Sequence, residues 1–191
     1  APAIGAVGVG DAQASVSFTA PAQDGGAPIT GYTVTSSPDG ISATGSASPI
    51  VVTGLTNGVA YTFTVTATNA AGIGPSSDAS NVVTPAAGQT ITFTDPGAQR
   101  FGTSPTLAAS ASSSLPVTYT SATTAVCTVT AEGVVSFVLT GNCTINADQS
   151  GNASYTAAPR VSQTFPVTAV APDAPAIGAV GVGDAQASVS F

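Results

Sequence analysis

The two cysteines are the residues whose type and spacing suggest the most specific chemistry in this chain. Cys127 and Cys143 lie in matching contexts, VCTVT and NCTIN, and each falls inside a run typical of a β-strand. One interpretation is a pair of buried free thiols. A strand-rich chain of extracellular character favours the other interpretation, a disulfide. That bond would close a loop of about 15 residues and stabilise the fold by about 3 kcal/mol through chain entropy.

The other side chains offer little for catalysis. The chain has no His, and its only basic residues are Arg100 and Arg160. Nucleophilic catalysis by Ser or Cys needs a base that titrates near neutral pH, and these residue types do not supply one. The nine acidic residues are scattered singly in turn or linker contexts, where Asp is a common turn former. We therefore expect no catalytic residues and no enzyme activity.

Cofactor and metal motifs are equally weak. Two Cys without His cannot form a structural zinc site. The sequence GVG at residues 8–10 begins like a dinucleotide-binding loop, but position 13 is Gln and no helical pattern follows, so it predicts a turn. Hard cations prefer several clustered carboxylates, and only Asp173 and Asp11 could approach a linker. We expect no cofactor and no metal, with calcium at the linker as an open alternative.

The charge composition argues against nucleic acid as a partner. Only 6% of the residues are charged, against about 25% in an ordinary soluble domain, and the formal net charge is −7. Without a basic patch, binding to a phosphate backbone has no electrostatic support. No apolar run approaches the ~18 residues of a membrane-spanning helix, so we expect no membrane insertion.

A repeat is the longest-range pattern in the sequence. Residues 174–191 read APAIGAVGVGDAQASVSF, letter for letter the same as residues 1–18. An identity of this length indicates a tandem repeat, in which position 174 restarts position 1. The chain is therefore expected to hold one complete unit and the first strands of the next. It would be a window on a longer array, or on a polymer whose subunits share strands.

The elements that must position these residues are β-strands. Alternation of apolar and polar residues with a period of two recurs along the chain, interrupted by Gly, Pro and Asn-Gly turns. Nothing in the sequence has the period of a helix. In the first half of the chain this alternation predicts inward-facing aromatic side chains at Phe18, Tyr32, Tyr61 and Phe63.

Two longer motifs make the first unit more specific. They read TAPAQDGGAPITGYTV and VTGLTNGVAYTFTVTATNAAGIGPSS. On these motifs residues 1–85 resemble a bacterial fibronectin type III domain. The resemblance implies seven short strands in two sheets and a tyrosine corner formed by Leu55, Gly58 and Tyr61, with the tyrosine hydroxyl bonded to nearby backbone. Phe18 stands where the family usually has a core Trp.

Residues 86–170 carry a second series of strand-like runs. In order they read QTITF, TLAAS, LPVTYTS, AVCTV, GVVSFVL, NCTINAD and VSQTFPVTA. Alternation would point Val135, Phe137 and Leu139 inward, and the sequence AEG at residues 131–133 predicts a hairpin turn. On the motifs PVTYTS, AVCTV, GNCTI and GNASY, this unit is similar to immunoglobulin-like repeats of large bacterial surface proteins.

These patterns predict an all-β chain of two tandem antiparallel β-sandwiches, and the two resemblances imply that these are fibronectin type III and immunoglobulin-like. Residues 171–173 would form a linker, and residues 174–191 would begin the next fibronectin type III-like repeat. Because Pro-rich linkers are semi-rigid, the linker would limit bending.

The function expected from this organisation is structural. The chain would be a repeat unit of a bacterial extracellular fibre or giant surface adhesin stalk, acting as a rigid spacer outside the cell or on its surface. Two alternatives remain open. One is the subunit of a non-covalent filament assembled by strand donation through residues 174–191. The other is a spacer or carbohydrate-contacting module of a secreted polysaccharide-degrading enzyme.

The expected partners are further copies of the same repeat, in the same or in neighbouring chains. Exposed strands are normally protected against association by charge, above all by Lys, and this chain has almost none of that protection. The strand faces would then be covered by neighbouring chains or kept apart by rigid tethering. A host or surface glycan would bind elsewhere in the full protein.

Overall fold

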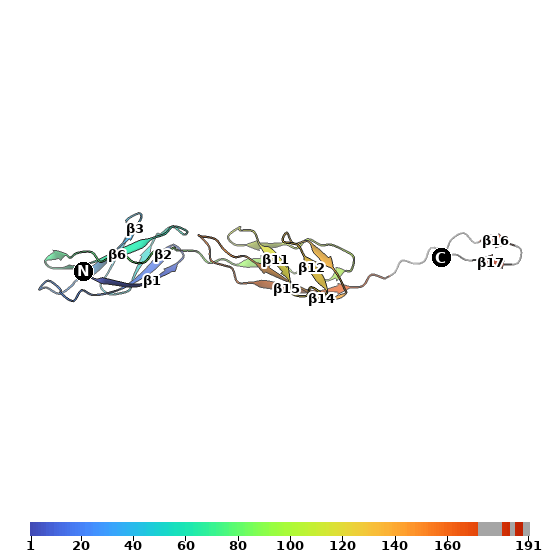
Figure 1. Cartoon of the computed structure of the whole chain (residues 1–191), viewed down its shortest axis with the longest axis horizontal. Helices are drawn as coiled ribbons and strands as arrows, with labels where there is room; N and C mark the ends of the chain where they lie inside the picture. The colour runs from blue at the N-terminus through green and yellow to red at the C-terminus, as the bar shows by residue number, and fades with distance from the viewer. Residues whose placement is uncertain (172–180, 184–185, 189–191) are drawn as a thin grey trace.

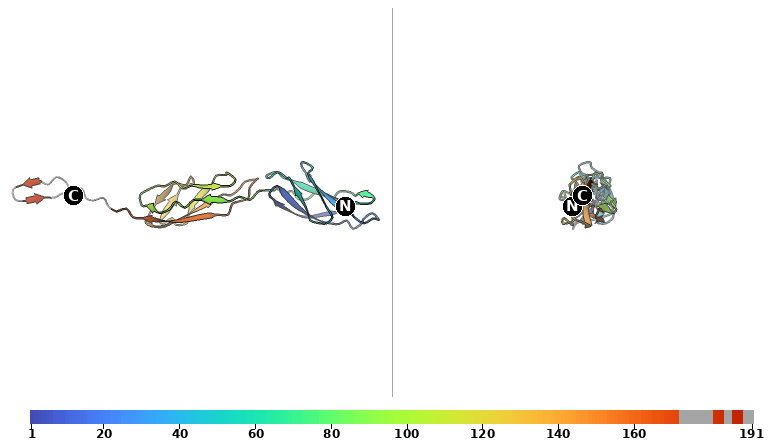
Figure 2. Two further views of the ribbon diagram at one scale, coloured as in Figure 1. Left: turned by 180° about the vertical axis from the view of Figure 1, so that it is seen from behind. Right: turned by 90° about the vertical axis from the view of Figure 1, so that its right-hand side faces the viewer.

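The structure is a computed structural model that describes residues 1–171, 181–183 and 186–188. Two β-sandwiches follow one another along the long axis of the molecule (Figure 1). The right-hand view of Figure 2 looks along that axis, and in it the two sandwiches overlap because they are arranged end to end. All regular elements of the described residues are strands, and each sandwich has a hydrophobic core of its own. The predicted all-β class is confirmed.

Seven strands build the first sandwich, as the resemblance implies. They are β1 (Ala3–Gly10), β2 (Gln13–Thr19), β3 (Gly31–Ser37), β4 (Ser42–Gly45), β5 (Ile50–Thr53), β6 (Thr62–Asn69) and β7 (Gly72–Ile73). One sheet has the order β1–β2–β5 and the other the order β4–β3–β6–β7, and all their pairs are antiparallel.

The core of the first sandwich follows the period-two pattern of the sequence. Tyr61, Phe63 and Val65 are fully buried along β6 and the residue before it, while the threonines between them are half-buried. Phe18 and Tyr32 face each other across the two sheets, with ring centroids 4.7 Å apart. Phe18 therefore fills the core position at which the sequence departs from the family pattern.

The second sandwich contains eight strands. They are β8 (Ile91–Phe93), β9 (Gln99–Arg100), β10 (Ala109–Ala111), β11 (Thr118–Ser121), β12 (Cys127–Val129), β13 (Val135–Phe137), β14 (Gly141–Asp148) and β15 (Val161–Thr168). Strands β11–β14–β15–β9 form one sheet, and β10–β8 and β12–β13 form two-stranded sheets. The seven runs read from the sequence correspond to seven of these strands. The short β9 was not expected, and it pairs in parallel with β15.

The prediction that Leu139 points into the second core is wrong. Val135 is fully buried and Phe137 packs partly buried against the core, but the Leu139 side chain is 58% exposed. The reason is that β13 ends at Phe137, and the Leu139 N–H then donates to the carbonyl of Val126. Alternation assigns faces only while the backbone remains extended, and here the strand has already ended.

Two short strands of the repeated segment pair with each other. Strand β16 (Gly181–Gly183) pairs with β17 (Gln186–Ser188), and Gly181 lies opposite Ser188. In the first sandwich, Gly8 lies opposite Ser15, which is the same register shifted by one repeat. The remainder of the predicted copy at 174–191 and most of the predicted linker lie outside the described residues.

Candidate functional site

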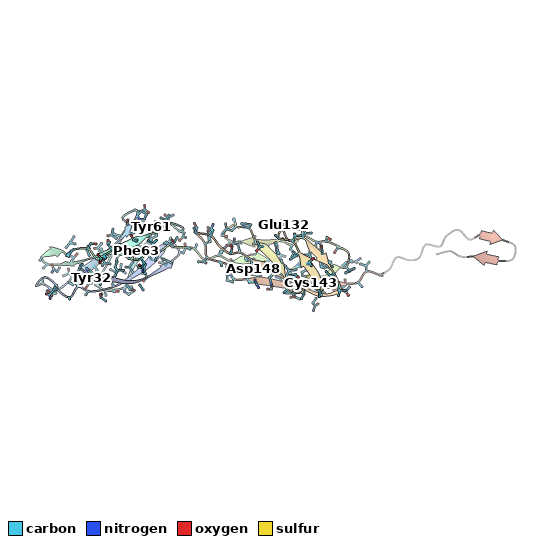
Figure 3. The ribbon with its side chains drawn as sticks, in the orientation of Figure 1. Tyr32, Tyr61, Phe63, Glu132, Cys143 and Asp148 are labelled. Atoms are coloured by element: carbon cyan, nitrogen blue, oxygen red, sulfur yellow. A yellow bond between two sulfur atoms is a disulfide. The ribbon has the colours of Figure 1, made fainter. Side chains whose placement is uncertain are left out.

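The predicted disulfide is confirmed. Cys127 at the start of β12 and Cys143 in β14 are bonded, with their Cα atoms 5.7 Å apart and both side chains fully buried. The Ser121 hydroxyl donates to the carbonyl of Cys127 at 2.7 Å. Cys143 is labelled in Figure 3, near the end of the second sandwich that is distant from the first. The disulfide therefore joins two of the sheets at that end.

The tyrosine corner has the predicted backbone contact and a further one that the sequence did not suggest. Tyr61 is fully buried, and its hydroxyl accepts the N–H of Thr56 at 3.1 Å. The same hydroxyl donates to a carboxylate oxygen of Asp39 at 2.9 Å. Leu55, the first residue of the motif, is also buried. Asp39 follows a Pro and precedes a Gly, so sequence reasoning assigned it only to a turn.

The linker between the sandwiches, residues 85–88, is hydrogen-bonded to both of them. The carbonyl of Pro85 accepts the N–H of Gly58, in the tyrosine corner, at 2.9 Å. Two residues later, Ala87 donates to the carbonyl of Ser154 and accepts the N–H of Thr156, both at 2.9 Å. Pro85 is itself fully buried. The linker is thus fixed on one side by the first sandwich and on the other by the second.

A loop of the second sandwich also contacts the first sandwich directly. The side-chain oxygen of Asn152 accepts the N–H groups of Ser154 and Tyr155 at 2.9 and 3.0 Å, which shapes this loop. The Ser154 hydroxyl then donates to the carbonyl of Asn57 at 3.3 Å. Asn57 is held in turn by Asp11, whose carboxylate accepts its side-chain N–H at 2.7 Å. We call residues 54–58, 85–88 and 150–156 the domain joint.

Beside the domain joint, a buried glutamine orders the near end of the second sandwich. The Gln89 amide donates to the side-chain oxygen of Gln149 and to the carbonyl of Thr156, both at 2.7 Å. Its own oxygen accepts the Ser113 hydroxyl. Buried polar groups are tolerated when they are hydrogen-bonded, as here. No sequence pattern indicates this cluster, because each of its hydrogen bonds joins residues at least 24 positions apart.

Gly58 offers a direct test of the domain joint. Its φ is +85°, and a Cβ added there would lie 2.6 Å from the Ser154 hydroxyl oxygen. Gly58→Ala is expected to destabilise the first sandwich by about 1–2 kcal/mol through the left-handed backbone and to push the 150–156 loop away. Thermal melting measures the first effect, and amide exchange of residues 150–156 measures the second. Gly97→Ala, at φ +68° with nothing within 4 Å of the added carbon, is the matched control for strain without contact.

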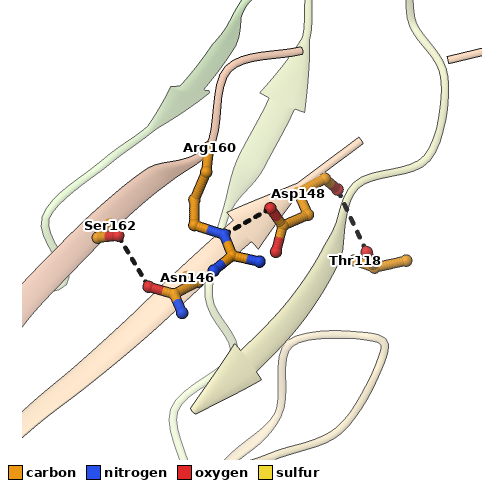
Figure 4. Close-up of polar contacts among 5 residues, drawn as sticks. All are labelled: Thr118, Asn146, Asp148, Arg160 and Ser162. Atoms are coloured by element: carbon orange, nitrogen blue, oxygen red, sulfur yellow. Dashed lines mark hydrogen bonds and ion pairs between the residues drawn. The ribbon is translucent and has the colours of Figure 1, made fainter. Parts of the chain in front are cut away.

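The sole ion pair of the described residues is a surface feature. Arg160 Nε and Asp148 Oδ1 are 2.7 Å apart (Figure 4), and the two side chains are 58% and 32% exposed. The hydrogen bond to Asp148, together with its charge, raises the pKa of Arg160. Ser162 donates to Asn146 beside this pair, at 2.8 Å. Exposed ion pairs contribute little to the free energy of folding. We therefore interpret this group as surface contacts of the sheet and not as a functional site.

Other candidate sites have a weaker basis. Across the described ranges, no group of three or more His, Cys, Asp or Glu side chains could hold a metal ion, and Asp173 of the linker-calcium alternative lies outside those ranges. In the same part of the chain, no helix has the length and apolar character to cross a bilayer. A cavity of about 250 Å³ lies at the end of the first sandwich opposite the domain joint, between the 21–29 loop and the β6–β7 hairpin.

Comparison with known proteins finds a family match for the first sandwich. The family model described as "Fibronectin type III domain" matches residues 2–83. No curated protein matches the chain. Titin module A71 from human cardiac muscle is 30% identical over 43% of this chain and 85% of its own, with a TM-score of 0.37.

Two further solved structures are similar over part of their length. The twitchin kinase region from C. elegans is 26% identical over 41% of this chain and 15% of its own, with a TM-score of 0.38. The C-terminal fragment of intimin, solved with the intimin-binding domain of its receptor, is 15% identical over 83% of this chain and 62% of its own, with a TM-score of 0.44. The chain therefore spans only a small part of the twitchin structure. The fibronectin type III match spans the first sandwich, which also has the seven strands and the tyrosine contact that the resemblance implies.

Proposed function

We propose that this chain is a structural repeat unit of a bacterial extracellular fibre or giant surface adhesin stalk, and that it acts as a rigid spacer. Residues 1–85 would be the fibronectin type III sandwich and residues 86–170 an immunoglobulin-like sandwich. The fibronectin type III family is typically a non-catalytic structural module that occurs outside cells, and a buried disulfide fits that location. Absence of enzyme activity remains a prediction.

The observation that supports a spacer best is the domain joint. A flexible tether would leave its backbone groups to water, whereas the linker here is hydrogen-bonded to Gly58 on one side and to Ser154 and Thr156 on the other. Inter-domain motion is the default expectation unless the interface resists it. A joint bonded on both sides, repeated along an array, would transmit orientation from unit to unit.

The repeat would then set the length of the fibre. A strand of about ten residues spans ~30 Å, so each unit of two sandwiches placed end to end would add about 60–70 Å. Adding or removing repeats would lengthen or shorten the stalk without a new fold.

A tryptic map of the native protein, denatured and reduced, tests the array. The chain can be cleaved only after Arg100 and Arg160, so the pattern is simple. An array predicts a peptide that runs from Val161 through Asp173 directly into Ala1–Arg100 of the next copy. A peptide that begins at Val161 and stops at Phe191 would instead contradict the array and support a short subunit.

Strand donation through residues 174–191 is the second candidate. Its basis is that this segment has the sequence of β1 and β2, which a neighbouring molecule could accept as missing strands. Against it, β16 and β17 pair with each other in the register of β1 and β2. Two strands that already pair in this register are ready to begin a new sandwich.

The carbohydrate-contacting alternative has less support. A sugar platform needs exposed aromatic rings, and the chain has no Trp. Tyr32, Tyr61 and Tyr119 are buried, and Tyr155 is half-buried in the loop at the domain joint. Binding on a glycan array that is lost on Tyr155→Ala would revive this alternative.

A further inference from the structure

The far end of the second sandwich carries exposed apolar side chains. They are Phe101, Val138, Leu139 and Val170. Strand pairing brings these side chains to one end, because Gly141 lies opposite Val167 and Arg100 lies beside Thr168. The residues just beyond those pairs therefore surround the point at which β15 ends. We call this surface the exit pole.

The first sandwich carries an apolar cavity at its own far end. This is the cavity of about 250 Å³ described above, and Pro2, Ile29 and Ile73 are among its lining residues. The Ile73 side chain is 75% exposed. Asn69 shapes the wall, since its side-chain amide donates to the carbonyls of Asp24 and Ala27. We call this cavity the entry cavity.

The two surfaces carry opposite charges. Arg100 is exposed at the exit pole and makes no ion pair within the described residues, whereas Arg160 is already paired with Asp148. Asp24 lines the entry cavity and is exposed. A positive group on one surface and a negative group on the other are complementary, and such pairs fix the register of an interface.

The spacing of the repeat makes the two surfaces neighbours. In an array, only residues 169–173 separate the end of β15 from the next Ala1. Five residues reach at most about 18 Å when fully extended, so the exit pole lies within that distance of Ala1 of the next copy. Ala1 and Pro2 line that cavity, which places the incoming chain at its edge.

We propose that the exit pole of one copy docks on the entry cavity of the next, forming a second joint in every repeat. Phe101 and Leu139 pack against Ile73 of the following copy, and Arg100 pairs with Asp24. The inference rests on the proposed tandem array and assigns it a specific contact. It also gives a packing partner to the exposed apolar side chains of the exit pole and to Ile73 at the entry cavity.

The experiment uses two complete repeats in tandem, each preceded by residues 169–173, so that both first sandwiches begin at a peptide bond and are followed by a second sandwich. That protein contains the same fibronectin type III sequence twice, once with a free entry cavity and once behind an exit pole. Amide NMR resonances of Ala71, Gly72 and Ile73 are expected to differ between the two copies, because only the neighbour differs. Coincident resonances would overturn the proposal.

Substitutions at the exit pole separate docking from mere proximity. Phe101→Asp combined with Leu139→Asp should make the two sets of resonances coincide, whereas Val51→Asp, at an exposed valine on β5, should not. Arg100→Asp should weaken the difference, and Asp24→Arg in the following sandwich should restore it. Resonance differences that survive the double substitution would contradict docking.

The NMR test and the tryptic map test different proposals, so either proposal can be contradicted while the other stands. The tandem protein reports on docking whether or not the natural protein is an array. Coincident resonances together with the Val161–Asp173–Ala1 junction peptide would refute docking and retain the array. Shifted resonances together with a peptide that ends at Phe191 would retain docking as a contact between separate molecules and refute the covalent array.

Discussion

Replacing both cysteines by Ala is expected to lower the stability of the second sandwich by about 3 kcal/mol, the largest effect of any change considered. The bond closes a loop with a sequence separation of 16, and removing it releases that loop in the unfolded chain. For a sandwich of this size the loss corresponds to a fall in Tm of about 12–24 °C. Differential scanning calorimetry in oxidising buffer measures it.

The two sandwiches provide controls for each other. The transition of the first sandwich, which contains no Cys, should keep its Tm in the Cys127→Ala/Cys143→Ala variant. A reductant should lower the second transition of the natural sequence but leave that of the variant unchanged. An unchanged second transition in the variant would show that the disulfide does not stabilise this sandwich.

Tyr61→Phe is expected to destabilise the first sandwich by about 1.5–3 kcal/mol. The substitution keeps the ring in the core but removes the hydroxyl that donates to Asp39 and accepts from Thr56. A hydrogen bond to a charged group contributes more than a neutral one, and a buried donor left without a partner adds a further cost. Urea unfolding followed by circular dichroism gives the change in free energy.

The partner of the tyrosine supplies the matched variant. Asp39 has a φ of +71°, a conformation that Asn tolerates well, so Asp39→Asn removes the charge without adding backbone strain. We expect a smaller loss than for Tyr61→Phe, because the amide oxygen still accepts. The two losses should not add in the double variant, since both substitutions act on the same hydrogen bond. Additive losses, or a Tyr61→Phe protein as stable as the parent, would contradict the role of this contact.

The sequence was most informative wherever the chemistry of a residue and the strand period acted together. Alternation identified Phe18, Tyr61 and Phe63 as core residues because a strand with one buried face must alternate. The matching contexts of Cys127 and Cys143 favoured the disulfide that the structure contains. Failures came where a strand ended. Leu139 was assigned inward because nothing local in the sequence marks the end of β13 at Phe137.

By itself, the sequence determined the all-β class, because the period of two recurs along the chain. It favoured the disulfide through residue type and context, and the family resemblance implied the tyrosine corner. Only the tertiary structure decided what the polar residues do. Asp39 reaches Tyr61, Gln89 reaches Gln149, and Ser154 reaches Asn57 across separations of 22, 60 and 97 residues. Such contacts depend on which loops come together at one end of a sandwich. The alternation of residues along a strand does not predict contacts between loops. The domain joint, which gives this chain its proposed role, belongs to that second group.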